Sequence, residues 1–350
     1  MDTRDFIALP KAVLHEHLDG GLRVDTILEI ADSEGYTDLP ADDADSLAAW
    51  FFQGRSGSLE RYLEAFVHTT AVMQTAESIS RIAYESAEDL AADGVVYAEV
   101  RYDPGLSTPG GLTREDAIEA ILDGFARASR DFGITVYLIV AALRHLTDSL
   151  DVVQAATPFI GQGVVAFDLA GPEKGFPPDL HLEACRLARQ NGLGLTLHAG
   201  EGDGPHSIWR ALALCDAQRI GHGVHIADDT DFDGSRISDL GAFARRVRDH
   251  RIPLEIAITS NLHTASYGTA VGHPFGALLA QGFNVSINTD NRLMSGVSVS
   301  SEYQLAAEAF QLSRSVLGHV TVNAIEAGFG DWPDRYRLIE DVVKPAYVFE

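Results

Sequence analysis

The sequence predicts an α/β fold, a (β/α)8 TIM barrel with extra helices between the first two strands and at the C-terminus. Two observations carry this prediction. Short apolar runs alternate with longer stretches whose apolar residues recur at helical spacing, which is typical of parallel βα units. Polar residues gather where these runs end, at the face where such a barrel builds its active site.

The apolar runs account for the barrel strands in chain order. Nearly every run is followed by a helical pattern, so a closed barrel fits the sequence better than an open, doubly wound sheet. The eight predicted strands are residues 12–15, 95–102, 135–143, 164–169, 193–198, 219–221, 253–258 and 284–288.

A long insert, residues 22–94, separates the first two predicted strands. Within it, residues 59–66 have apolar side chains at helical spacing, and such an excursion can roof the mouth of a barrel. A later helix, 302–312, and the tail, 323–347, are expected to pack outside the barrel. Because one barrel can run to this length, we expect a single domain over residues 1–350.

Charge limits the partners that the protein can bind. Acidic residues outnumber basic residues by 51 to 26, which gives a formal net charge of −25. A surface of this sign repels polyphosphates, so nucleic acid and anionic membranes are poor candidates. The acidic run 228–239 misses the ligand spacing of an EF-hand, and we expect a solvated turn there.

Cysteine usage and the N-terminus indicate the compartment. Cys185 and Cys215 lie far apart in the sequence and outside C-x-x-C spacing, so we expect buried thiols rather than a disulfide or a thiolate zinc site. Residues 1–10 lack the apolar core of a signal peptide, and no stretch is long enough to span a bilayer. These features predict a soluble, cytoplasmic protein; the oligomeric state is not predicted.

His15 and His17 end the first predicted strand, just before an Asp19-Gly20-Gly21 turn. Side chains at i and i+2 of a strand point to the same face, so this pair can chelate a metal ion. Taken alone, the pair could equally be buried, hydrogen-bonded histidines. Polar residues at the other strand ends favour a metal site; they are Asp168, His198, Glu201, His222, Ser260, Asn261, Asp290 and Asn291.

Three imidazoles and one carboxylate in this set, His15, His17, His198 and Asp290, are ligands of the kind that hold a catalytic divalent metal. Zinc fits best, with one position left for water. A metal-bound water needs a proton acceptor, and the substrate needs a proton donor.

Two further residues have the chemistry of that acceptor and donor. Glu201 lies in a glycine-rich turn that lets the backbone approach a ligand closely, so it can bond substrate without ligating the metal. His222 is bracketed by glycines, which fits an imidazole reaching into a tight site. Spacing alone leaves open that His222 is a fourth nitrogen ligand or a core histidine.

The chain resembles the adenosine deaminases, zinc aminohydrolases of the amidohydrolase superfamily. The matching motifs occur in the family's order over essentially the whole chain, and the ordered set is far more specific than any one motif. They are His15-Glu16-His17-Leu18-Asp19-Gly20, Val95-Val96-Tyr97-Ala98-Glu99-Val100-Arg101-Tyr102, Asp168-Leu169-Ala170-Gly171, His198-Ala199-Gly200-Glu201, Gly221-His222-Gly223, Ser260-Asn261-Leu262 and Asn288-Thr289-Asp290.

The resemblance implies the zinc-dependent hydrolysis of adenosine and 2′-deoxyadenosine to the inosines and ammonia, in purine salvage. One Zn2+ per chain would be held by His15, His17, His198 and Asp290. Glu201 would donate a proton to purine N1 while a zinc-bound hydroxide attacks C6. His222 would take the proton from the zinc-bound water, orient the hydroxide and stabilise the charge that develops.

Substrate contacts are implied by the same resemblance. The backbone N–H of Gly171 would bond N3, and Asp19, with His17, would lie near the ribose hydroxyls. Asn291 occupies the position that contacts purine N7. An apolar gate over the pocket would consist of Leu59, Tyr62, Leu63 and Phe66, although a helix face packed on the core explains the same spacing.

The sequence departs from the family pattern at two places. Asn291 stands where most relatives have a second aspartate, and Arg292 follows it in place of proline. A carboxylate must be protonated to donate to N7, whereas an amide donates without that requirement, so we expect adenine recognition with an altered pH dependence. In the seventh strand, Ala257 and Ile258 replace Cys-Pro, and we expect local repacking.

Other functions stay open at this point. The same chemistry could act on adenine or a modified adenosine, a catalytically silent barrel could bind nucleosides or a protein, and an unrelated metal-dependent hydrolase could use this fold. Asp19 and the Gly171 motif favour a nucleoside, and retention of Glu201 argues against a silent barrel. Deaminases of RNA or DNA are disfavoured because their H-x-E…P-C-x-x-C signature is absent.

Overall fold

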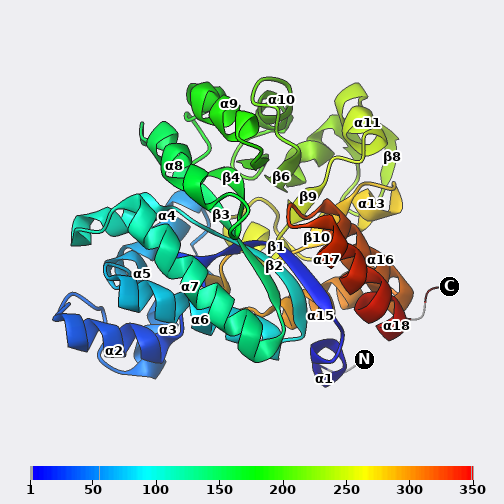
Figure 1. Ribbon diagram of the computed structural model, residues 1–350. Coiled ribbons are helices and arrows are strands. Elements are labelled where there is room, and N and C mark those ends of the chain that lie inside the picture. The colour runs from blue at the N-terminus through cyan, green and yellow to red at the C-terminus, as the bar shows by residue number, and fades with distance from the viewer. Residues whose placement is uncertain (1–2, 55, 348, 350) are drawn as a thin grey trace.

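The computed structural model describes residues 3–54, 56–347 and 349, and eight parallel strands form its central barrel (Figure 1). The strands follow one another around the barrel in chain order, which confirms the predicted (β/α)8 fold. They are β1 (Lys11–His17), β2 (Val95–Tyr102), β3 (Thr135–Leu143), β4 (Val164–Ala170), β5 (Gly194–Ala199), β6 (Arg219–His222), β9 (Leu254–Ile256) and β10 (Val285–Ile287).

The first and last strands meet at what we call the barrel seam, the contact between β1 and the end of β10. His17 N donates to Asp290 O at 2.8 Å, and Asp290 N donates to His15 O at 2.9 Å. The side chain of Asn288 continues this contact, since its Oδ1 accepts from Leu14 N at 2.8 Å and from His15 N at 3.1 Å. The seam therefore brings residues from both ends of the chain to one place.

Charged side chains fill part of the barrel interior. Arg101, Glu99, Asp168, Arg219 and Glu255 are all fully buried. Arg101 pairs with Asp168 and with Glu255 at 2.7 Å each, and Arg219 pairs with Glu99 at 2.6 Å. Because each buried charge has a partner of opposite sign, the interior tolerates them, and the carboxylates are held in fixed positions.

The predicted insert between β1 and β2 is helical. It holds α2 (Val24–Glu34), α3 (Ala44–Phe51), α4 (Leu59–Leu63), α5 (Phe66–Ala71) and α6 (Ala76–Ala92). Side-chain caps fix where three of these helices begin. Asp43 Oδ1 accepts from Ser46 N at α3, Ser58 Oγ accepts from Arg61 N at α4, and Thr75 Oγ1 accepts from Ser78 N at α6. The long α6 packs beside α7 (Arg114–Phe132) outside the barrel (Figure 1).

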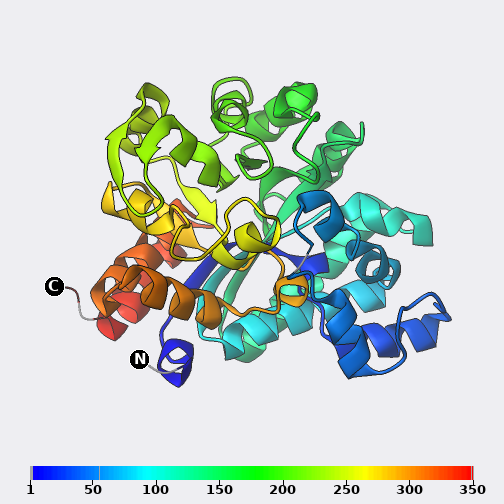
Figure 2. The ribbon, with the colours of Figure 1, turned by 180° about the vertical axis from the view of Figure 1, so that it is seen from behind.

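Helices after β10 also lie outside the barrel, as expected. They are α14 (Arg292–Ser295), α15 (Val299–Phe310), α16 (Arg314–Ala327), α17 (Trp332–Arg337), a π-helical segment (Leu338–Val343) and α18 (Lys344–Ala346). Figure 2 shows the orange α15 beside the dark blue α1 (Thr3–Ile7), and these two helices are in contact. None of the helices in the described part of the chain has the length and apolar character needed to cross a membrane.

The acidic run is more ordered than a simple solvated turn. It contains two short antiparallel strands, β7 (Thr230–Phe232) and β8 (Ile237–Leu240). Asp233 Oδ1 closes the turn between them by accepting from Ser235 N at 2.9 Å and from Arg236 N at 2.8 Å. The turn prediction therefore applies to the tip of this hairpin, and cross-strand pairing orders its arms.

The seventh barrel strand is shorter than predicted. β9 ends at Ile256, and Ile258 is the first residue of α12 (Ile258–His263). The carboxylate of Glu302 accepts from Thr259 N at 3.1 Å in the first turn of α12. This hydrogen bond satisfies an N–H group that the first turn of a helix leaves without a partner, which helps the helix form despite the β-propensity of Ile258.

Candidate metal and catalytic site

A cavity of about 220 Å³ lies at the carboxyl ends of the barrel strands. Nearly every residue that the sequence singled out lines it, from strands far apart in the chain. The predicted site residues in its lining are His17, Asp19, Gly171, His198, Glu201, His222, Asp290 and Asn291, together with the four apolar residues Leu59, Tyr62, Leu63 and Phe66. His15 is fully buried beside this lining.

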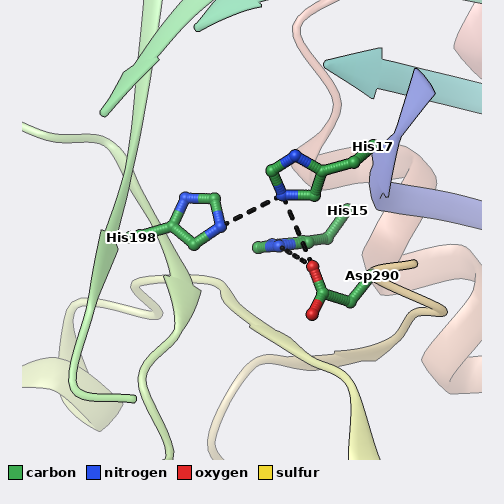
Figure 3. A group of neighbouring side chains, drawn as sticks. All are labelled: His15, His17, His198 and Asp290. Carbon is green, nitrogen blue, oxygen red and sulfur yellow. Dashed lines mark hydrogen bonds and ion pairs between the residues drawn. The ribbon is translucent and has the colours of Figure 1, made fainter. Parts of the chain in front are cut away.

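The four predicted metal ligands converge. One side-chain nitrogen or oxygen of each of His15, His17, His198 and Asp290 lies within 4.8 Å of all the others. Asp290 Oδ1 is 3.2 Å from His15 Nε2 and 3.4 Å from His17 Nε2, which is itself 3.3 Å from His198 Nε2 (Figure 3). Three imidazole nitrogens and one carboxylate oxygen, directed at a common point, fit a divalent cation such as zinc.

Buried carboxylates orient two of these imidazoles. His15 Nδ1 bonds Glu255 Oε2 at 2.8 Å, and His198 Nδ1 lies 2.9 Å from Asp168 Oδ2. Arg101 contacts both carboxylates, so the two rings are tied to one guanidinium. With each Nδ1 occupied in this way, each Nε2 is left to face the centre of the group. The sequence analysis missed Glu255, whose only signal is an acid between apolar strand residues.

Backbone strain marks two site residues. Asp290 has φ +61° and His222 has φ +58°, a region that residues other than glycine rarely occupy. The backbone hydrogen bonds of the barrel seam hold Asp290 in this conformation. Ser260 Oγ also holds its side chain, by donating to Asp290 Oδ2 at 2.6 Å. The surrounding bonds therefore aim this carboxylate at the imidazoles, against its local preference.

The carboxyl group of Glu201 is buried within the cavity. Burial first, and then the negative charges of Asp290 and Glu173, raise the pKa of Glu201 well above its usual range. Thr264 Oγ1 donates to Glu201 Oε1 at 3.3 Å, and Ser266 Oγ donates to the backbone O of Glu201 at 3.0 Å. Glu201 is thus a carboxyl group held in a fixed position, and its surroundings favour the protonated form.

A chain of hydrogen bonds sets the tautomer of His222. Phe275 N donates to His273 Nδ1 at 3.1 Å, and burial lowers the pKa of His273 to about 3, so this neutral ring carries its proton on Nε2. His273 Nε2 lies 3.3 Å from Asn261 Oδ1, and Asn261 Nδ2 lies 3.1 Å from His222 Nδ1. The amide therefore donates to His222 Nδ1, and the proton of neutral His222 sits on Nε2, which faces Glu201.

The remaining predicted contacts also line the cavity. Burial raises the pKa of Asp19 to about 7, and its Oδ1 has no hydrogen-bond partner among the described residues. Gly171 has φ +88°, a backbone conformation that favours glycine. Asn291 is buried against Gly20, and its Oδ1 likewise lacks a partner in the described part of the chain. Polar atoms of this kind are available for a polar ligand.

The apolar gate residues cover the cavity from α4 and the start of α5. Leu59, Leu63 and Phe66 are half-buried and line the cavity. Tyr62 is fully buried, and its hydroxyl lies 2.7 Å from Ser295 Oγ. Tyr62 anchors the helix to the core while its neighbours present an apolar surface to the cavity, and their action as a gate stays a prediction.

Comparison with known proteins agrees with this site. The family model described as adenosine deaminase matches residues 10–345. An adenosine deaminase of Mycobacterium tuberculosis (strain H37Rv) is 48% identical over 344 residues, which cover 97% of this chain and 94% of that protein.

Two solved structures are similar over nearly their whole length. The adenine deaminase of Arthrobacter aurescens superposes with a TM-score of 0.86 at 26% identity, covering 96% of this chain and 99% of that one. An amidohydrolase from Burkholderia ambifaria, solved with bound Zn, gives a TM-score of 0.85 at 26% identity, covering 98% and 92%.

Proposed function

Since this chain belongs to the adenosine deaminase family, we propose that it hydrolyses adenosine and 2′-deoxyadenosine to inosine and 2′-deoxyinosine, releasing ammonia, in purine salvage. One observation carries the proposal: four convergent metal ligands and the buried carboxyl group of Glu201, whose pKa is raised, share one cavity. Hydrolytic deamination of a purine needs both, a nucleophile made from water and a proton for the ring.

We infer that His15, His17, His198 and Asp290 hold one zinc ion. Their donor atoms and spacing fit that metal, and the family is metal-dependent. When bound, zinc would supply the Lewis acidity that yields a strong nucleophile from water at neutral pH. Asp168 and Glu255 would hold the rings of His198 and His15 in the orientation that binding requires.

Glu201 would act as the general acid. Attack at C6 breaks the aromaticity of the purine and moves electrons onto N1, which then needs a proton. Burial raises the pKa of Glu201 and so favours the protonated form that can supply this proton. The donated proton neutralises the negative charge that the attack places on N1, and that charge then resides on the Glu201 carboxylate.

His222 would orient the nucleophilic oxygen. As a neutral ring with its proton on Nε2, it donates a hydrogen bond into the site and stabilises negative charge there. Acceptance of a proton from water at the same atom requires the opposite tautomer, with Nε2 bare. That second part of the predicted role stays a prediction.

The cavity favours a nucleoside as the substrate. Gly171 N–H would bond N3, the amide of Asn291 would bond N7, and Asp19 and His17 would contact the ribose. No lysine or arginine occurs among the described residues that line the cavity, so a 5′-phosphate would lack a counter-charge. This observation argues against a nucleotide, and the unsatisfied Asp19 oxygen argues against free adenine as the main substrate.

Two broader expectations belong to the same proposal. We place the protein in the cytoplasm, a setting that fits two buried, unbridged cysteines, Cys185 and Cys215. We also treat residues 1–350 as one domain, because the barrel seam joins the beginning of the chain to residue 290.

The test is the ultraviolet conversion of adenosine, 2′-deoxyadenosine and adenine by purified protein, before and after chelation with zinc add-back. We expect turnover of both nucleosides, little turnover of adenine, loss on chelation and recovery with zinc. Turnover of adenine alone would show that the ribose contacts are wrong. Zinc-loaded protein that converts none of the three would overturn the proposal.

A further inference from the structure

The carboxylate of Glu173 lies beneath the backbone of the turn that carries Glu201. Its Oε1 accepts from Gly200 N at 2.6 Å, and its Oε2 accepts from Glu201 N at 3.0 Å, Gly202 N at 2.7 Å and Asp203 N at 3.1 Å. Successive backbone N–H groups that converge in this way form an anion-binding concavity. Here the chain itself supplies the anion. The glycine-rich turn was expected to bring its backbone close to a ligand, but these N–H groups bond Glu173 instead.

Glu173 belongs to a different loop, which also reaches the cavity. It lies two residues after Gly171, in the loop that follows β4, whereas Glu201 lies in the loop that follows β5. One carboxylate therefore ties together the backbone of the two loops. In the proposed function these loops contact the two nitrogens of the pyrimidine ring, Gly171 at N3 and Glu201 at N1.

From this geometry we propose that Glu173 is a positioning residue for the deamination. It fixes the 200–203 turn so that the Glu201 carboxyl and the Gly171 N–H stay in register on the pyrimidine ring of the substrate. The inference rests on the proposed function and adds to it a residue that touches neither substrate nor metal.

The surroundings of Glu173 fit a fixed charge. The residue is only 4% exposed, and bonds from N–H donors to an ionised carboxylate are about twice as strong as neutral ones. Arg144, also buried, interacts with its charge and donates from Nη2 to His198 O at 2.6 Å. On the opposite side, Ser266 holds the backbone O of Glu201. The peptide before and after the catalytic carboxyl is thus held on both sides.

Substitution of Glu173 separates positioning from general support of the fold. Glu173→Gln keeps the size of the side chain but presents an NH2 group to N–H donors, which displaces the turn. We expect kcat for adenosine to fall about 10- to 100-fold, since a displacement near 1 Å can cost that much. KM should change less than about threefold and zinc content not at all, because no ligand or ground-state contact is removed.

A matched control removes a comparable contact elsewhere. Asp229 Oδ2 accepts from Ala244 N at 2.8 Å at the start of α11 (Ala242–Asp249) and does not line the cavity. Asp229→Asn should lower the melting temperature and leave kcat unchanged. If Glu173→Gln changes only the melting temperature, as this control does, the positioning role is overturned.

A double substitution gives the sharpest distinction. Once Glu201→Gln has removed the acid, displacement of the turn can no longer impair proton donation. Adding Glu173→Gln should therefore reduce the residual kcat by less than about twofold. Multiplied losses would contradict the inference. If Glu173→Gln does not fold, Glu173→Asp carries the same measurements, because its shorter carboxylate cannot reach all of the N–H groups.

The wild-type assay keeps the two proposals apart. If wild-type protein deaminates no adenine compound, the proposed function fails and the positioning role fails with it. If wild type is active and Glu173→Gln retains its full kcat, only the positioning role fails.

Discussion

Glu201 Oε2 lies 3.5 Å from His222 Nε2 in the cavity. Burial changes the two pKa values in opposite directions, raising that of Glu201 and lowering that of His222 well below its usual range. Both shifts favour the uncharged forms of the two groups, a carboxylic acid and a neutral imidazole, over an ion pair. Neighbouring groups whose pKa values are driven apart are typical of an acid and its catalytic partner.

Glu201→Gln tests the acid directly. We expect zinc content to be unchanged and kcat to fall by about 10² to 10⁴, the usual contribution of general acid catalysis. Zinc analysis and steady-state kinetics with adenosine measure both effects, and Glu183→Gln, exposed on α9 (Leu182–Gln190), is the control. Substantial retained turnover would remove Glu201 from its role.

Asn261→Asp reverses the hydrogen-bond preference at His222. A carboxylate accepts from Nδ1–H, so it favours the tautomer with a bare Nε2, which no longer donates into the site. We expect kcat to fall about 10- to 100-fold with zinc retained, and ¹⁵N NMR of His222 to report the new tautomer. An unchanged or higher kcat would instead support His222 as the base. Asn191→Asp, on the surface, is the control.

Asn291→Asp tests the departure from the family pattern. The introduced carboxyl can donate to purine N7 only when protonated, so we expect KM for adenosine to rise with pH in the variant, by about tenfold once the carboxyl ionises. The wild-type amide should show no such rise. Parallel KM values of the two proteins across the pH range would show that this side chain does not donate to the ring.

Glu302→Gln should change how stability depends on pH. Burial raises the pKa of Glu302 to about 7, so the folded chain keeps this proton at pH values where the unfolded chain has lost it. The contribution of Glu302 to stability therefore falls by about 3 kcal/mol as pH rises from about 4.5 to about 7, and it changes no further above that range.

The glutamine variant lacks that loss, because it cannot ionise. The melting temperature of the variant, relative to that of the wild type, should be higher at pH 8 than at pH 5. Glu308→Gln, at an exposed position on the same helix, is the control. If the difference in melting temperature between the variant and the wild type is the same at both pH values, the ionisation of Glu302 does not affect stability and the prediction is wrong.

The sequence predicted most of the fold and the residues of the site for a physical reason. Strand ends in a parallel barrel meet at one face, so residues such as His15 and Asp290 could be grouped from their strand positions alone. It could not predict Glu173, Glu255 or the order from His273 through Asn261 to His222. Those contacts depend on side-chain rotamers and on loops that meet only in three dimensions. The end of β9 likewise depends on Glu302, which lies 43 residues beyond Thr259 in the sequence.

The barrel seam also sets a time order on the assembly of the site. Two of the ligands, His15 and His17, lie near the beginning of the chain and the last, Asp290, lies far along it. A chain still being synthesised therefore cannot complete the ligand set until residue 290 has left the ribosome, and closing so long a loop is entropically costly. Tight metal binding therefore indicates that the first and last strands of the barrel have joined. The bound metal in turn stabilises the closed barrel.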